Sequence, residues 1–364
     1  MASLNVGGPS IKFKNLLVVI KQTAYEEYSQ LKLRGVAPKA LRWKRLEQRY
    51  RSHKQCVTDL LALLREHHVV QFSCVNRVDL DRQHLSGVDL IVAVGGDGTV
   101  LSSAHFVDHG TIPLLGINSD PNKSGADRQV NMKKLDERRS HGALCMFTAD
   151  DMESGLQEVL YGGGHLQKRT RLRCKVKSTF AETQLVPALN DLLIANPSPA
   201  AVSRFRMGWM RNLVGDQEDD AALAKEENPY GTVTRFGGKP YDVFNSLNVW
   251  SSGMWVCTAT GSTAAMAAAG GMPMPSLTSD SVQYLIREHM REKGSSALMQ
   301  DNKQGGFPDN GIIEDGQKLH IRWNSQTGRI FVDGSHLTHH LELGDEILID
   351  NKAPPLLLYG REQI

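Results

Sequence analysis

The sequence has few cysteines and no long apolar run. Its five cysteines are scattered, odd in number and never arranged as Cys-x-x-Cys. This spacing excludes a disulfide framework and the usual zinc sites, and it favours a reducing compartment. No segment approaches the roughly 18 consecutive apolar residues that a membrane helix needs. We therefore expect a cytoplasmic protein that does not bind membranes.

An excess of charge of either sign is also missing. The 42 Lys and Arg residues nearly balance the 40 Asp and Glu residues, so the net charge is +2. This balance gives no electrostatic reason to expect nucleic acid or a membrane surface as a partner. The chain has 364 residues, of which 40% are apolar, and this length predicts two domains.

The first half of the chain alternates between strand and helix patterns. Apolar runs at 16–20, 69–75, 90–94 and 111–118 predict strands, and helical spacing of apolar residues appears at 53–68 and 151–161. Glycines after Tyr161 are expected to end the second helix. The alternation predicts a parallel, Rossmann-like sheet covered by helices, with ligands beyond the carboxyl ends of its strands.

From Lys168 onward, short strand candidates are separated by turn residues, which predicts mostly antiparallel sheet. The expected fold is an α/β domain over residues 1–160, followed by a β-rich dinucleotide-binding and dimerisation domain over residues 161–364. A polar insertion at about 213–240 reads as a solvated loop, and the C-terminal tail can pack back on the first domain. We expect Arg169, Arg171 and Arg173 to share one solvated or interface face of a strand.

The segment Gly95-Gly96-Asp97-Gly98-Thr99 lies between a predicted strand and a predicted helix. Its glycines can adopt positive φ and admit a ligand close to the backbone, while the helix N-terminus and the Thr99 hydroxyl suit phosphate oxygens. A carboxylate repels phosphate, so Asp97 suits a general base for an attacking hydroxyl, or a Mg²⁺ ligand. On this pattern alone, an Asp97 that merely caps the helix fits equally well.

The GGDGT segment resembles the signature shared by NAD kinases, diacylglycerol kinases, sphingosine kinases and phosphofructokinases. Three later stretches narrow this resemblance. "ALNDLLIANPSP" from Ala188 is similar to the Asn–acidic motif of NAD kinases, and "CTATGSTAAM" from Cys257 resembles their T-P-T-G-S-T-A-Y segment. "GRIFVDGSHL" predicts a hairpin turning at Asp333-Gly334, to which we assign a structural role. Their order along the chain is specific to NAD kinases.

Departures from the usual family pattern resemble the plant-type NADH kinases. Ser252 stands where most members carry an aspartate near the nicotinamide, and Ala265 replaces an aromatic residue. Reduced nicotinamide is neutral whereas the oxidised ring is a cation, so loss of a carboxylate there could favour NADH by roughly 1 kcal/mol. A serine that only hydrogen-bonds the carboxamide is the other possibility.

The resemblance implies transfer of the ATP γ-phosphoryl to the 2′-hydroxyl of the adenosine ribose of NADH, less well of NAD⁺, producing NADPH. Mg²⁺ would enter with ATP, and the sheet domain would form a homodimer with the site between domains. Asp97 would be the catalytic base, and Gly95, Gly96, Gly98 and Thr99 would bind phosphates. The resemblance assigns the acceptor dinucleotide to Asn190, Asp191, Ser252, Thr260, Gly261, Ser262 and Thr263.

Two alternatives remain open at the level of sequence. A lipid kinase of the diacylglycerol or sphingosine type also uses a GGDGT turn, but it needs an apolar acyl-chain pocket. A non-catalytic dinucleotide sensor would keep the glycine turns without turnover. The carboxylate of Asp97 argues against the sensor, because phosphate binding gains nothing from it.

Overall fold

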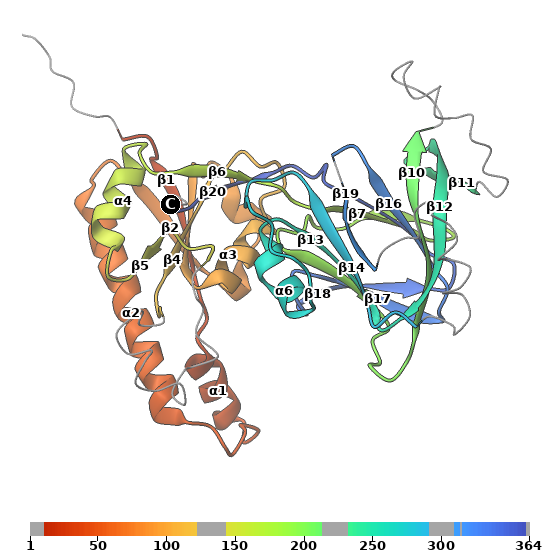
Figure 1. Cartoon of the computed structure of the whole chain (residues 1–364). Helices are drawn as coiled ribbons and strands as arrows, with labels where there is room; N and C mark the ends of the chain where they lie inside the picture. Colours follow the sequence, from red (N-terminus) through yellow and green to blue (C-terminus); the bar gives the residue numbers. More distant parts are fainter. Residues whose placement is uncertain (1–10, 122–142, 213–231, 291–308, 314, 362–364) are drawn as a thin grey trace, which may run out of the picture. The chain divides into compact units, whose positions relative to one another are not determined.

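The computed structural model describes residues 11–121, 143–212, 232–290, 309–313 and 315–361 (Figure 1). The chain divides into two compact units. Unit 1 runs to Lys168 and includes the C-terminal segment from Leu356, while unit 2 is Arg169–Pro355. Among the described residues, no helix is both long and apolar enough to cross a membrane.

Unit 1 is built on one sheet with the strand order β2-β1-β3-β4-β20-β6, and β5 pairs with β4. Every pairing among β1, β2, β3, β4, β5 and β20 is parallel. β3 and β4 are buried throughout, as expected for parallel strands covered on both faces. The strands are β1 (Asn15–Ile20), β2 (Gln71–Asn76), β3 (Leu90–Gly95), β4 (Leu114–Asn118), β5 (Phe147–Thr148), β6 (Leu166–Arg169) and β20 (Leu356–Tyr359).

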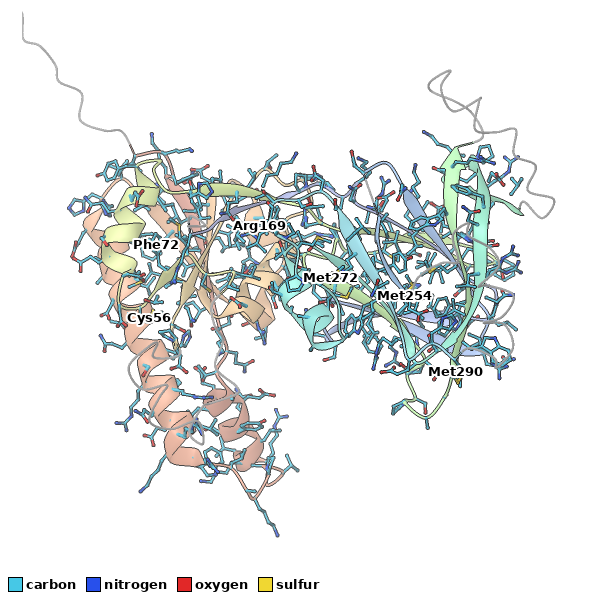
Figure 2. All side chains as sticks on the ribbon, viewed as in Figure 1. Cys56, Phe72, Arg169, Met254, Met272 and Met290 are labelled. Carbon is cyan, nitrogen blue, oxygen red and sulfur yellow. The ribbon has the colours of Figure 1, made fainter. Side chains whose placement is uncertain are left out.

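Helices cover both faces of this sheet. α2 and α4 share one core with Leu16, Val92 and Leu115, and Cys56 on α2 is labelled in Figure 2. On the other face Val100 of α3 packs at Gly116 of β4. The helices are α1 (Ala24–Leu33), α2 (Trp43–Glu66), η1 (Arg77–Asp79), η2 (Arg82–Leu85), α3 (Asp97–Ala104) and α4 (Met152–Leu160). The predicted parallel sheet with helical cover is confirmed.

Unit 2 is a sandwich of two antiparallel sheets, with the orders β11-β12-β10-β16-β19-β7-β8 and β15-β14-β13-β9-β17-β18. The first sheet contains β7 (Arg173–Lys177), β8 (Glu182–Gln184), β10 (Ser203–Asn212), β11 (Thr232–Phe236), β12 (Lys239–Ser251), β16 (Lys318–Trp323) and β19 (Glu346–Asp350). The second contains β9 (Asp191–Ala195), β13 (Gly253–Thr258), β14 (Val282–Arg287), β15 (Asn310–Ile313), β17 (Thr327–Val332) and β18 (Leu337–Glu342). Two short helices, η4 (Gly261–Thr263) and α6 (Ala265–Ala268), follow β13.

The two sheets of unit 2 enclose one apolar core. Phe205, Ile321 and Ile347 come from the first sheet, whereas Ile194 and Met254, which is labelled in Figure 2, come from the second. Burial alternates along strands such as β7 and β17, because each inner face packs and each outer face meets water. The predicted antiparallel second half is confirmed.

The polar insertion differs in part from its prediction. Residues 213–231 lie outside the described part of the chain, but residues 232–240 do not form a loop. Thr232–Phe236 is strand β11, paired with β12 around a turn in which Gly237 and Gly238 have φ values of 57° and 76°. Phe236 and Tyr241 are buried in a small cluster with Leu348, and this burial stabilises the hairpin.

The prediction for the three arginines is wrong. β6 ends at Arg169 and β7 begins at Arg173, so these residues do not share one strand. Arg169 and Arg171 are buried, and Arg171 Nε donates to the carbonyl of Pro354 at 2.6 Å. Arg173 pairs with the buried carboxylate of Asp350. Hydrogen-bond partners brought from distant sequence allow these cations to leave solvent.

Candidate active site

The GGDGT turn lies at the carboxyl edge of the unit 1 sheet. Gly95 ends β3, Gly96 is the N-cap of α3, and α3 starts at Asp97. None of Gly95, Gly96 and Gly98 has positive φ, so the predicted conformational reason for these glycines is wrong. Gly95 is required for space, because a Cβ there would lie 2.2 Å from Thr99 Oγ1. Nothing lies within 4 Å of a Cβ built on Gly98, so the outer surface of the turn is open.

We expected the Thr99 hydroxyl to be available to phosphate oxygens, but the structure buries it. Its side chain is only 2% exposed, with Oγ1 beneath the turn against Gly95. Its amide donates to the Gly96 carbonyl at 2.8 Å, which tightens the start of α3. Thr99 therefore supports the turn from inside, and Gly98 presents the exposed backbone.

Asp97 is the first residue of α3 and is partly exposed. Its carboxylate accepts the amide of Ala143 at 3.1 Å and the amide of Leu144 at 2.9 Å. The N-cap residue is Gly96, so Asp97 does not cap its own helix, and that alternative is excluded in this structure. The two amides and the Cys145 thiol, whose Sγ lies 3.9 Å from Oδ1, orient the Asp97 carboxylate.

The segment that bonds Asp97 reaches it because β4 carries a glycine. A Cβ on Gly116 would lie 2.8 Å from the Leu144 carbonyl and 3.0 Å from Cys145 Cα. The amide of Met146 donates to the Gly116 carbonyl at 3.0 Å, which fixes the segment on the strand. Close backbone approach at Gly116 thus delivers two amides to Asp97, and the sequence pattern gave no signal for this contact.

His53 on α2 is linked to the turn through Ser119. Its Nδ1 lies 2.8 Å from Ser119 Oγ, and the Ser119 amide donates to the Gly95 carbonyl at 2.9 Å. Burial lowers the pKa of His53 to about 4, and the nearby Lys21 and Lys54 ammonium groups act in the same direction. The imidazole is therefore neutral near pH 7. A histidine on the apolar face of a predicted helix was the only sequence signal for this role.

In unit 2, Asp333 fixes the Asn–acidic motif. Its carboxylate accepts the amides of Leu189, Asn190 and Asp191 at 2.8, 2.7 and 2.9 Å. Asp333 lies at the β17–β18 turn with φ 49°, and Gly334 beside it has φ 114°. The predicted hairpin is confirmed, and the aspartate has a positioning role that its turn position alone did not reveal.

The Thr260–Thr263 segment packs directly on Asn190. A Cβ on Gly261 would lie 2.1 Å from the Asn190 carbonyl oxygen, so only glycine fits. Thr258, at the end of β13, links the two segments, because its Oγ1 donates to the Leu189 carbonyl at 2.5 Å and accepts the Gly261 amide at 3.2 Å. The structure therefore brings Asn190, Asp191 and Gly261 together.

The hydroxyl residues of this segment fall into two kinds. Ser262 is fully buried and links the Ala259 carbonyl to the Met274 amide, whereas Thr263 is exposed. Thr260 Oγ1 accepts from Arg169 Nη1 at 3.3 Å. Thr263 is followed by the short helix α6, which spans only Ala265–Ala268. A four-residue helix has too few aligned peptides for a strong terminal dipole.

Asp191 is a buried carboxylate with a perturbed ionisation. Burial raises the pKa of Asp191 to about 7, and the negative charge of Asp333 acts in the same direction. Asp191 therefore titrates near neutral pH. A carboxyl group of this kind can donate to an acceptor when protonated or accept from a hydroxyl when ionised.

Ser252 lies apart from the other predicted acceptor residues. It precedes β13, whereas Thr260 follows it, and the register pairs Met254 with Ile194 and Cys257 with Asp191. At about 3.3 Å per residue, the strand separates Ser252 from the Asn190 region by roughly 20 Å. Ser252 Oγ donates to the exposed carboxylate of Glu288, so the local negative charge is not lost.

Comparison with known proteins gives consistent matches. Residues 18–122 match the family model described as the ATP-NAD kinase N-terminal domain. A protein of Arabidopsis thaliana named NADH kinase is 34% identical over 96% of this chain and 98% of its own length. A protein of Oryza sativa subsp. japonica named probable NADH kinase is 32% identical over 89% of this chain and 86% of its own length.

Two solved structures share the fold. The yeast NADH kinase complexed with NADH aligns with a TM-score of 0.62 and 14% identity, over 97% of this chain and 85% of that one. An NAD kinase from Archaeoglobus fulgidus in complex with ATP aligns with a TM-score of 0.54 and 17% identity, over 96% and 94%. Nothing in these comparisons favours a lipid kinase or a non-catalytic sensor. Given the extent of the plant matches, this chain belongs to the NAD kinase family.

Proposed function

We propose that this enzyme transfers the γ-phosphoryl group of Mg-ATP to the 2′-hydroxyl of the adenosine ribose of NADH, producing NADPH and ADP, with NAD⁺ as a poorer acceptor. The plant relatives named NADH kinase and probable NADH kinase support this reaction. The observation that carries the mechanism is the position of Asp97. It stands between Gly96 and Gly98, and its partly exposed carboxylate accepts the amides of Ala143 and Leu144.

Asp97 acts as the general base. As the ribose oxygen attacks the γ-phosphorus, its proton passes to the Asp97 carboxylate, the new O–P bond forms, and the bond to the β-phosphate oxygen breaks to release ADP. The exposed backbone at Gly98 and the N-terminus of α3 bind phosphate oxygens. Most of the remaining catalysis is positioning and charge stabilisation.

The acceptor dinucleotide is held by residues of unit 2. Asn190, Asp191 and the Thr260–Gly261 backbone contact its adenosine half, and Thr263 contributes an exposed hydroxyl. Ser262 keeps this segment in place through its bonds to Ala259 and Met274. Asp333 positions Asn190 and Asp191 without touching the dinucleotide.

Mg²⁺ enters with ATP as part of the substrate. Within the described part of the chain, no group of three or more His, Cys, Asp or Glu side chains could hold a metal ion. In phosphoryl transfer the ion neutralises charge on the transferred group, and on this ground we assign it to the ATP phosphates. Activity that persists in excess EDTA would contradict this assignment.

Replacement of Asp97 tests the proposed chemistry. Asp97→Asn removes the base and should lower kcat by about two powers of ten or more, with little change in dinucleotide affinity. Asp89→Asn is a matched control, because Asp89 lies just before β3 at its opposite end and its Oδ2 also accepts two amides, those of Lys14 and Asn15. NADPH formation is measured with NADH and NAD⁺ supplied separately. Near-normal turnover by Asp97→Asn would exclude the mechanism.

The preference for NADH rests on the relatives rather than on Ser252. Glu288 places a carboxylate beside Ser252, so the simple argument from a missing charge does not apply. Ser252→Asp and Glu288→Gln test this charge in opposite directions. A ratio of kcat/KM for NADH over NAD⁺ that is unchanged in both variants would exclude this region from acceptor choice.

We also propose a homodimer and a cytoplasmic location. Trp250 and Met290 are adjacent, large and about half exposed in unit 2, which supports an interface there. All five cysteines are free, as expected for a reducing compartment. Sedimentation of the purified protein and cell fractionation test the two proposals; a monomer at micromolar concentration would exclude the first.

A further inference from the structure

Three strands of unit 1 end at one level of the sheet, close to the GGDGT turn. Ile20 of β1 is paired with Asn76 of β2 and with Val94 of β3. The next residues of β1 and β2 are Lys21 and Arg77, so two cations follow adjacent strand ends. The Lys21 amide donates to the Val94 carbonyl at 3.0 Å. The Cβ of Lys21 lies 2.9 Å from the position that a Cβ on Gly95 would take.

A third cation reaches this edge from α2. Arg49 Nε lies 3.6 Å from Oδ2 of Asp120, and the two side chains are 18% and 20% exposed. Asp120 follows Ser119, whose amide is bonded to the Gly95 carbonyl. Lys21, Arg49 and Arg77 therefore lie at this edge of the sheet, together with the carboxylates of Asp120 and of Asp97 in the turn. We call the three cations the Lys21 cluster.

The cations of the Lys21 cluster act on one another electrostatically. Withdrawal from bulk solvent lowers the pKa of Lys21; Asp120 opposes this effect, but Arg49 and Arg77 both add to it. His53 nearby is neutral near pH 7, so it neither adds to nor offsets the positive charge. Like charges gathered at one edge repel each other, and a bound polyanion removes that repulsion.

We propose that the Lys21 cluster binds the polyphosphate chain of the ATP donor, beside the amides of the GGDGT turn. The proposal rests on the proposed function for the identity of the donor. Three cations can pair with the anionic phosphate oxygens that the Mg²⁺ bound to ATP leaves exposed. The residues assigned to the acceptor lie in unit 2, whereas the Lys21 cluster and the catalytic base lie together in unit 1.

Binding of nucleotides without turnover tests the proposal. Calorimetric titration of the full chain with ATP, AMP and NADH is compared between wild type and Lys21→Met. We expect the Kd of ATP to rise about tenfold or more, the effect of losing a charge-assisted contact. The Kd values of AMP and NADH should stay within about twofold, because AMP lacks the β- and γ-phosphates.

Lys14→Met is the matched control. Lys14 is an exposed lysine directly before the opposite end of β1, so this change removes the same charge from the same strand without touching the Lys21 cluster. It should leave all three affinities unchanged. Arg77→Met, on the partly exposed η1, is a second test of the cluster and should weaken ATP in the same selective way.

Two results would overturn the proposal. One is an unchanged ATP affinity in Arg77→Met and in a folded Lys21→Met, with folding checked by thermal unfolding. The other is a loss of NADH affinity as large as that for ATP, which would assign the cluster to the dinucleotide pyrophosphate. Because these are binding measurements, they remain decisive even if the wild-type enzyme fails to produce NADPH from NADH, the result that would refute the proposed function.

Discussion

At the residue scale, the carboxylates of this enzyme differ mainly in their surroundings. Asp97 is partly exposed and bonded to two amides, whereas Asp191 is buried beside Asp333. Burial opposes ionisation, and a neighbouring negative charge opposes it further. Under the proposed function, the same side-chain chemistry serves two tasks, proton acceptance by Asp97 and hydroxyl recognition by Asp191.

Asp191 should make stability depend on pH. Its folded pKa is about 7, against an unfolded value near 3.8, so between these values the folded state holds more protons. Stability therefore falls as pH rises from about 4 to about 7. Asp191→Asn should remove this dependence and be more stable than wild type by about 2–4 kcal/mol at pH 8. Urea unfolding at pH 4.5 and pH 8 measures the free energy of unfolding of both proteins. A difference between variant and wild type that is equal at both pH values would contradict the prediction.

Asp333 is predicted to act on the acceptor site from outside it. Asp333→Ala leaves three backbone amides without their acceptor and should cost about 2–4 kcal/mol of stability. It should also raise the KM for NADH more than it lowers kcat, because Asn190 and Asp191 lose their fixed position. Steady-state kinetics with both substrates varied measure the split. A kcat effect alone would point to a role in the chemical step instead.

At the scale of elements, the site depends on glycines that let one segment approach another. Gly116 admits the 143–145 segment onto β4, and Gly261 admits the Thr260–Thr263 segment onto Asn190. Strand interiors otherwise disfavour glycine, which contributes no side chain to packing. At Gly116 and Gly261, the missing side chain allows the close approach that fixes the backbone groups around Asp97 and Asn190.

Gly116→Ala should disable the enzyme indirectly. Its new Cβ would lie 2.8 Å from both the Leu144 carbonyl and Val100 Cγ2, so the segment must withdraw from Asp97. We expect a stability loss of about 1–3 kcal/mol and a reduced kcat. Gly98→Ala is the control, because no atom lies within 4 Å of its Cβ. It should change stability by about 0.5 kcal/mol or less and act on the KM for ATP. Equal melting temperatures for the two variants would contradict this account.

At the scale of the whole molecule, the chain leaves unit 1, builds unit 2 and then returns. β20 adds to the unit 1 sheet between β4 and β6, and Leu356, Leu358 and Tyr359 are at most 1% exposed. Unit 1 therefore needs residues from both ends of the sequence. Unit 2 is continuous from Arg169 to Pro355 and contains its own core.

Truncation after Pro355 should destabilise one unit selectively. Loss of three buried side chains removes about 5–9 kcal/mol of apolar burial from unit 1, enough to unfold a typical domain. Unit 2 should keep its own unfolding transition. Scanning calorimetry and limited proteolysis, with Leu358→Ala as a milder comparison, measure the two units separately. A parallel loss of both transitions would show that unit 2 depends on β20.

Local patterns in the sequence were sufficient for the two types of sheet and for the position of the GGDGT turn. Uninterrupted apolar runs such as Leu90–Val94 identify buried parallel strands, and GGDGT identifies the turn that follows. Ser252 could be noticed from the sequence, but its neighbour could not. Glu288 lies 36 positions away, and only strand pairing brings it into contact.

The sequence by itself determined which segments become strands and helices and which turn carries the lone aspartate, because these follow from periodicity and turn chemistry within a few residues. Only the tertiary structure decided what those residues touch. Asp97 is held by amides 46 and 47 positions away, and Asp333 holds amides 142–144 positions away. Such bonds form because packing brings buried polar groups to the nearest partner in space, and sequence distance has no part in that choice.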